Sequence, residues 1–169
     1  MEYSPYDVAV FLLACDLTHA DELVTIHSIW AGNSIPIQYR QDEILFKRHI
    51  YWELSKFDGL MSDIEALNIL LKDTEHALDM NGTVNEQGII ERYFKVIKLE
   101  LTYAEGREFC KIKLRRLLKK FGYKRRSAQL VATIKSTLQT LELKTYVKGY
   151  VLCDIAEIGI DEMIMIRLK

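Results

Sequence analysis

The side chains of this sequence that could do chemistry are mostly cationic, and ten of them lie within residues 107–126. They are Arg107, Lys111, Lys113, Arg115, Arg116, Lys119, Lys120, Lys124, Arg125 and Arg126, and they share the segment with one acid, Glu108. A dense group of cations points to a polyanion as the partner. The alternative is a basic face that packs on acidic residues of the same chain or stays solvated.

The net charge of the whole chain hides this asymmetry, because it is only −1. Residues 1–106 carry 8 Lys and Arg against 18 Asp and Glu, a balance of −10. Residues 107–169 carry 15 against 6, a balance of +9. The sequence therefore consists of an acidic part followed by a basic part of similar magnitude.

Uncharged polar side chains follow the basic run at helical spacing. In a helix that begins near Ser127, they lie on the side away from the apolar residues. They are Gln129, Thr133, Ser136 and Gln139. Glutamine can pair with adenine through two hydrogen bonds and hydroxyl groups can donate or accept, so this side suits the recognition of base edges in the major groove. An ordinary solvated helix face has the same composition, and that alternative stays open.

The cations nearest this helix are candidates for phosphate contacts. Lys124, Arg125 and Arg126 directly precede it, beside the amide groups of its first turn. One of the two arginines could instead fold inward to pair with an acid such as Asp161. Lys148, near the first predicted strand, is a weaker candidate for a minor-groove contact. The predicted DNA-binding residues are Lys119, Lys120, Lys124, Arg125, Arg126, Ser127, Gln129, Thr133, Ser136 and Lys148.

The sequence predicts neither a metal site nor a cofactor, and no catalytic residues. Its 3 cysteines and 4 histidines show no metal-ligand spacing, and the odd cysteine count favours reduced, buried thiols over a disulfide framework. A glycine-rich phosphate loop and a G-x-S-x-G motif are both missing from the sequence. An enzyme would have to use scattered acids such as Glu53 and Asp58, so we expect a protein that is not an enzyme.

Two short helices must position the basic and polar residues. The first has an apolar stripe that Gly122 can close, and the second begins at Ser127 as its N-cap. The stripes consist of Leu114, Leu117, Leu118 and Phe121 in the first helix, and of Leu130, Ile134, Leu138 and Leu141 in the second. Two short helices joined by a tight, glycine-containing turn predict a helix-turn-helix.

Extended runs follow at residues 145–154 and 162–168 and predict a β-hairpin. In the last run Ile164, Ile166 and Leu168 fall on one face, which we expect to face the core. Residues 97–103 alternate between apolar and polar, so a strand there is as well supported as a continued helix. Such a strand would complete the small sheet of a winged helix.

The acidic part is predicted to be helical. Ser4-Pro5 and Thr18 begin two helices, which end near Leu17 and Gly32. Further helices are expected at 41–57 and 62–80, and one from Thr83 onward. The predicted fold class is mainly α (α+β), with a helical N-terminal domain at 1–95 and a basic winged helix-turn-helix domain with a small antiparallel sheet at 96–169.

The C-terminal third resembles a winged-helix module of bacterial proteins that occurs beside CBS domains and other regulatory or defence-associated partners. The resemblance covers residues 113–168 and is carried by the leucines of 114–118, Phe121-Gly122, Arg125-Arg126-Ser127, Leu143 and Ile160-Asp161. Lys120 stands where the module usually has Trp, and Glu142 where it usually has Gly. The resemblance implies DNA association, and residues 1–96 resemble no family.

These observations predict a bacterial or phage protein that binds duplex DNA and has a regulatory or defence-related role. The alternative is a protein-protein interaction adaptor, or a subunit of a larger complex, in which the acidic helices bind a protein partner or a second copy. The apolar stretches are far shorter than a membrane span and the N-terminus lacks the basic region of a secretory signal. A cytoplasmic location without membrane contact is therefore expected.

Overall fold

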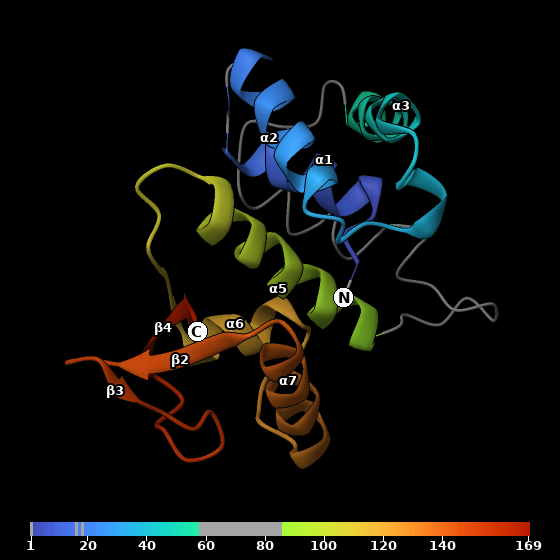
Figure 1. The fold of residues 1–169 in the computed structure, drawn as a ribbon. Coiled ribbons are helices and arrows are strands. Elements are labelled where there is room, and N and C mark those ends of the chain that lie inside the picture. Colours follow the sequence, from blue (N-terminus) through green and yellow to red (C-terminus); the bar gives the residue numbers. More distant parts are fainter. Residues whose placement is uncertain (1, 16, 18, 58–85) are drawn as a thin grey trace. The chain divides into compact units, whose positions relative to one another are not determined.

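The computed structural model describes residues 2–15, 17, 19–57 and 86–169, which form six α-helices, a short 3-10 helix and one four-stranded antiparallel sheet (Figure 1). The protein is therefore a mixed α+β protein with its sheet near the C-terminus. Contacts divide the chain into two compact units, Met1–Leu70 and Leu71–Lys169. The helix predicted at 62–80 and the capping residues from Thr83 to Asn85 lie outside the described residues.

Helix α1 (Pro5–Cys15) begins where the sequence predicts. The Ser4 amide and hydroxyl both donate to the Asp7 carboxylate at 2.8 Å, and the Asp7 amide donates back to the Ser4 hydroxyl at 3.2 Å. This reciprocal cap satisfies the free donors of the first turn. Within the first unit α1 packs against α3, and the Tyr6 and Phe57 rings lie 5.9 Å apart.

The other two helices of the first unit also follow local signals. Helix α2 (His19–Ala31) ends before Gly32, as predicted, and Asn33 then takes the left-handed conformation with φ 58°. Helix α3 (Glu43–Ser55) begins after Asp42, whose carboxylate accepts from the Leu45 amide at 2.8 Å. The connector between them contains the 3-10 helix η1 (Ile37–Tyr39).

Helix α5 (Glu86–Tyr103) includes residues 97–103, so the strand considered for that segment is wrong. The buried residues Ile90, Phe94, Ile97 and Leu101 recur at helical spacing and belong to the core of the second unit. The third strand of the predicted sheet comes instead from β1 (Cys110–Lys113). Because α5 runs through residue 95, this helix crosses the predicted domain boundary between 95 and 96.

The sheet has the order β1-β4-β2-β3, with every neighbouring pair antiparallel. Strands β2 (Leu143–Val147) and β3 (Val151–Leu152) form a hairpin that overlaps the first predicted run but begins before it, and β4 (Met163–Leu168) lies in the second run. Ile112, Leu143, Ile164 and Ile166 cover one face of the sheet and join the core with α5, α6 (Leu114–Lys120) and α7 (Ala128–Thr140).

Strand β4 corrects one part of the predicted core. Ile164 and Ile166 are fully buried as expected, but Leu168 is 39% exposed, whereas Met165, expected on the opposite face, is only 8% exposed. Met165 is covered because β4 is a central strand, where Lys111 of β1 and Tyr146 of β2 are its cross-strand neighbours. Leu168 is the last paired residue of the strand, at the end of the sheet.

Candidate nucleic-acid interface

Helices α6 and α7 are joined by a tight turn whose geometry the sequence largely determines. Gly122 follows α6 with φ 85°, a conformation that glycine adopts readily, and its amide donates to the Lys119 carbonyl at 3.0 Å. Ser127 caps α7, because its hydroxyl accepts from the Leu130 amide at 3.2 Å. The segment therefore consists of two short helices with six residues between Lys120 and Ser127, and of the two N-caps only Ser127 of α7 makes a side-chain hydrogen bond.

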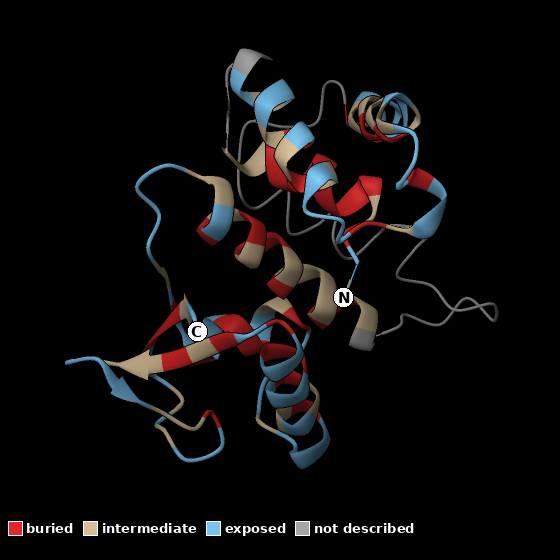
Figure 2. Ribbon diagram, in the orientation of Figure 1, coloured by how far each residue is buried: buried red, intermediate tan, exposed pale blue. Residues whose placement is uncertain are grey.

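The side of α7 that faces away from the core carries uncharged hydrogen-bonding groups. Figure 2 shows buried and exposed positions on different sides of this helix. Gln129 and Ser136 are exposed and Thr133 is half-buried, with its hydroxyl donating to the Gln129 carbonyl at 3.1 Å. These three of the polar residues predicted to read bases thus share one accessible helix face, and the Thr133 hydroxyl can still accept a hydrogen bond.

Three predicted phosphate ligands lie exposed around the turn before α7. They are Lys119 at the end of α6 and Lys124 and Arg125 in the turn itself. In the described part of the chain, none of these three side chains has a hydrogen bond or ion pair. Their charges are therefore available to an anion beside the first turn of α7, where the helix dipole also favours negative charge.

Arg126 does not project into solvent with them. Its Nη1 donates to the carbonyl oxygens of Ile155, Ala156 and Ile158 at 2.7–2.8 Å. The inward alternative is therefore correct for one of the two arginines, although the acceptors are backbone carbonyls and not the expected Asp161. Arg126 ties the β3–β4 connection to the turn, and these carbonyls occupy its Nη1.

Lys120 is also less available than predicted. It is half-buried, with its ammonium 5.4 Å from the centre of the Tyr93 ring, and burial together with the nearby Arg116 lowers its pKa. Lys148 is exposed in the turn of the β2–β3 hairpin, followed by Gly149. The two residues therefore differ: Lys148 can approach a ligand, whereas Lys120 lies largely against the protein.

Ion pairs occupy several other cations of the basic run and its surroundings. Arg115 binds the Asp161 carboxylate through Nε at 2.6 Å and Nη2 at 2.8 Å, and Lys135 binds Asp154 at 2.6 Å. Arg107 pairs with Glu100 at 2.7 Å. Some cations of the basic run thus make contacts within the fold, whereas others are available to a ligand. The number of basic residues in the sequence does not distinguish the two groups.

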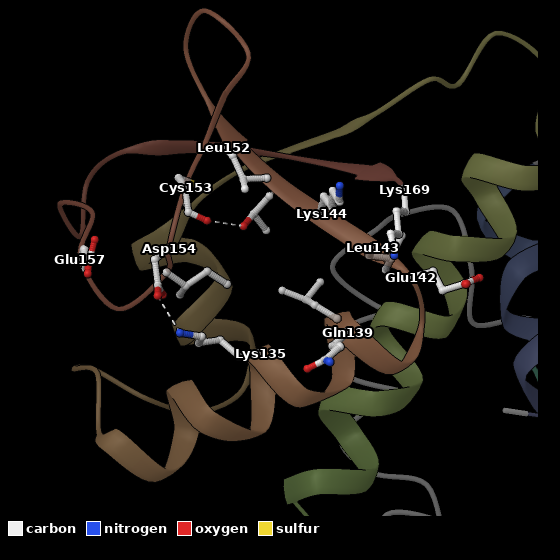
Figure 3. A pocket seen from close by; sticks show the side chains of 13 residues that line it. Lys135, Gln139, Glu142, Leu143, Lys144, Leu152, Cys153, Asp154, Glu157 and Lys169 are labelled. Carbon is white, nitrogen blue, oxygen red and sulfur yellow. Dashed lines mark hydrogen bonds and ion pairs between the residues drawn. The ribbon is translucent and has the colours of Figure 1, made fainter.

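A groove that sequence reasoning missed lies beside α7, with a volume of about 770 Å³ (Figure 3). It is bounded by the C-terminal half of α7, by β2 and by residues 152–157. Its charged lining is mixed, with Lys135, Lys144 and Lys169 opposed by Glu142, Asp154 and Glu157. Such a lining does not favour a polyanion, because the carboxylates offset the ammonium groups.

The groups considered for metal binding or catalysis are dispersed. Within residues 2–15, 17, 19–57 and 86–169, no three His, Cys, Asp or Glu residues form a cluster that could hold a metal ion. Cys15, Cys110 and Cys153 are half-buried thiols, and burial raises the pKa of the Cys110 and Cys153 thiols. Glu53 is buried and pairs with Lys56 at 2.9 Å, and Asp58 lies outside the described residues.

A second feature missed from the sequence is the outer face of the sheet. Cationic and aromatic side chains gather there, in particular Lys111, Phe109, Tyr150 and Arg167. The available signal is the alternation of Lys111 and Lys113 around Ile112 in β1. This alternation escapes notice because the same residues belong to a longer basic run.

We found no match to this chain among protein-family models, curated proteins or solved structures. Among the helices that the structure describes, none is both long enough and apolar enough to cross a membrane.

Proposed function

We propose that residues 107–169 form a winged helix-turn-helix that binds duplex DNA, with α7 as the recognition helix. One observation carries this proposal: α7 presents Gln129, Thr133 and Ser136 on one accessible face, directly beside the free cations Lys124 and Arg125 at its first turn. Polar groups of this kind can hydrogen-bond to base edges, and the cations hold the phosphates that flank the groove.

The order of elements supports the same assignment. Strand β1, helices α6 and α7 and the β2–β3 hairpin follow one another, and β4 closes the sheet between β1 and β2. In such a module the helix enters the major groove and the hairpin lies beside it on the duplex. Lys148 in the hairpin turn then serves as a further backbone contact, whereas Arg126 and Lys120 act inside the protein.

The left-handed conformation of Glu142 supports the resemblance to the bacterial winged-helix module. Glu142 follows the C-cap residue Leu141 with φ 56°, a position that favours glycine, and the resembled module usually has glycine there. The backbone of this chain thus keeps the conformation that the usual residue would prefer. The role we propose is regulatory or defence-related and non-catalytic.

The test measures binding of the full chain to a labelled duplex by fluorescence anisotropy at several salt concentrations. With Lys119, Lys124, Arg125 and Lys148 on phosphates, the logarithm of the affinity should fall against the logarithm of salt with a slope of roughly −3 to −4. Lys124→Ala with Arg125→Ala should weaken binding to all duplexes alike and make the slope shallower. Arg48→Ala, which removes an exposed cation of α3, is the matched control and should have no effect. The absence of binding to any duplex at low salt would remove the proposal.

A second candidate function is supported by apolar residues on the surface of the first unit. Ile44 and Trp52 of α3 are 73% and 60% exposed, and a spacing of eight residues, slightly more than two turns, places them on the same side of the helix. Exposed apolar side chains on one face are typical of a surface that binds protein. Under this alternative the acidic unit recruits a protein partner or a second copy, and affinity for duplex DNA is weak and lacks the steep dependence on salt.

A further inference from the structure

The outer face of the sheet is distinct from the helix-turn-helix surface. The strand register places Lys111 and Lys113 of β1, Met165 and Arg167 of β4, and Lys144 and Tyr146 of β2 on this face. The opposite face carries Ile112, Ile164 and Ile166 of the core. Residues that lie opposite each other on adjacent strands point to the same side of the sheet, so these outer side chains form one continuous surface.

This surface carries four cations and no acid at an outward position of β1, β2 or β4. The cations are Lys111, Lys113, Lys144 and Arg167, of which Lys144 also lines the groove beside α7. At the rim, Glu108 pairs with Arg167 at 3.2 Å, but the carboxylate is 76% exposed and the other three cations have no ion pair in the described part of the chain. The face is therefore positive and can hold an anionic chain.

Aromatic rings are interleaved with these cations. The Lys111 ammonium lies 4.8 Å from the centre of the Phe109 ring. The central carbon of the Arg167 guanidinium lies 5.8 Å from the Phe109 ring centre and 5.1 Å from that of Tyr150. Tyr150 is 61% exposed although it sits beside Arg167, so part of its ring remains open to a ligand.

The backbone at Tyr150 adds a second indication. Tyr150 has φ 61°, in the left-handed region, which glycine and asparagine adopt more easily than a bulky aromatic residue. Keeping a large ring in this conformation at an exposed turn costs free energy, and strain of this kind is often found at binding sites. The position therefore favours a use for the ring that a small turn residue could not supply.

From this combination we infer that the outer sheet face binds single-stranded nucleic acid. Cations on a groove or face hold the phosphates, and exposed rings stack on the bases with little dependence on sequence. A duplex fits less well, because its base faces are stacked inside the helix and only an unpaired strand presents them to an aromatic side chain. The inference does not depend on duplex recognition by α7, because the two surfaces use different residues.

The experiment titrates the full chain against a labelled oligo-thymidylate of about 20 nucleotides, longer than a typical stacking site, and against an abasic strand of equal length. We expect the oligo-thymidylate to bind at low salt and the abasic strand, with the same phosphates but no bases, to bind at least about five-fold more weakly. Equal affinity for the two strands, or no binding to the oligo-thymidylate, would overturn the inference. An acidic polypeptide such as poly-glutamate that competes as well as the oligo-thymidylate would also overturn it, because charge alone would then explain the surface.

Variants locate the site. Tyr150→Asn suits the left-handed backbone and should weaken oligo-thymidylate binding about five-fold or more, while Tyr150→Phe keeps the ring and should bind like the native chain. Lys111→Ala with Lys113→Ala should weaken it as well. The double variant Lys124→Ala with Arg125→Ala should lose duplex affinity and keep oligo-thymidylate affinity, so failure of one surface is distinguishable from failure of the other. Native affinity in both the Tyr150→Asn and the Lys111→Ala with Lys113→Ala proteins would exclude this face.

Discussion

The Arg115 guanidinium donates two hydrogen bonds, of 2.6 and 2.8 Å, to the Asp161 carboxylate, which lies 46 residues further along the chain. The pair joins the start of α6 to the residues just before β4, and the Arg115 amide adds a bond to the Ile160 carbonyl at 2.7 Å. A bidentate ion pair fixes the relative orientation of the two side chains as well as the distance between them. One cation of the basic run thus positions the connection that leads into the central strand of the sheet.

This pair predicts a dependence of stability on pH. The hydrogen bonds from Arg115 hold the pKa of Asp161 below its usual range. A depressed pKa in the folded state contributes stability above the usual pKa of about 4, and that stability is lost as the pH falls through the folded-state value. The melting temperature of Asp161→Asn should therefore lie below that of the native chain at pH 7, and the difference should close near pH 2.

The effect should be small and sensitive to salt, because both side chains are largely exposed. Thermal melts followed by circular dichroism at low and high salt measure it. A difference between the two proteins that stays constant from pH 7 to pH 2 would show that the pair contributes nothing through its charge.

We expect Arg126 to contribute to stability and its neighbour Arg125 to contribute only to binding. Arg126→Ala removes the donor to three carbonyls of residues 155–158, and charged hydrogen bonds of this kind contribute about 1.5–3 kcal/mol. The neighbouring Arg125→Ala should change the free energy of unfolding by less than about 0.5 kcal/mol, because Arg125 is exposed. Urea denaturation of the two variants measures the difference, and equal losses would contradict the assigned roles.

Local signals in the sequence predicted the capped starts of α1 and α7. Ser4 and Ser127 cap α1 and α7 as expected, because a cap needs only residues within one turn of each other. The apolar stripe of α7 was predictable for the same reason. Residues 97–103 fit two periodicities. Ile97 and Leu101 are four residues apart, which is helical spacing, and they also fall on the same face of a strand, where every second residue points to one side.

Distant contacts explain what the sequence could not predict about the site. Arg125 and Arg126 are adjacent and chemically identical, yet only Arg126 meets carbonyls that lie 29 to 32 residues further along the chain. The outer sheet face depends on the register of β4 between β1 and β2, which brings Lys111, Tyr146 and Met165 side by side. Neither the contacts of Arg126 nor this strand register can be predicted from residues that are close together in the sequence.

We expect a substitution at Glu142 to stabilise the protein. Its φ of 56° costs about 1–2 kcal/mol for a residue with a side chain, and its ion pair with Lys98 is long at 3.7 Å and exposed. Glu142→Gly should therefore raise the free energy of unfolding by about 1 kcal/mol. Gly122→Ala is the inverse control: a Cβ there meets no atom within 4 Å, so its expected cost of about 1–2 kcal/mol comes from backbone strain alone. Denaturant melts that show no gain for Glu142→Gly would mean that the exposed pair outweighs the strain.

Strand β4 should be needed for the whole second unit, because it lies between β1 and β2 in the sheet. Ile166→Ala should cost about 2–5 kcal/mol, as for other fully buried aliphatic residues, whereas Leu168→Ala should cost less than about 1 kcal/mol. A chain that ends after Asp161 should lose the cooperative unfolding of this unit. Similar losses for the two single variants would place Leu168 in the core after all.

Tyr150 predicts opposite effects on stability and on binding. Relief of the left-handed strain in Tyr150→Asn should raise the free energy of unfolding by about 0.5–1 kcal/mol, although the contact with Arg167 at 5.1 Å is lost. The same change should weaken binding of the oligo-thymidylate, because a stacking ring is removed. Tyr150→Phe should leave both quantities near their native values, since it keeps the ring and the strain. A Tyr150→Asn protein that melts at a lower temperature than the native chain would show that the ring holds the hairpin in place, and its exposure would then need no ligand to explain it.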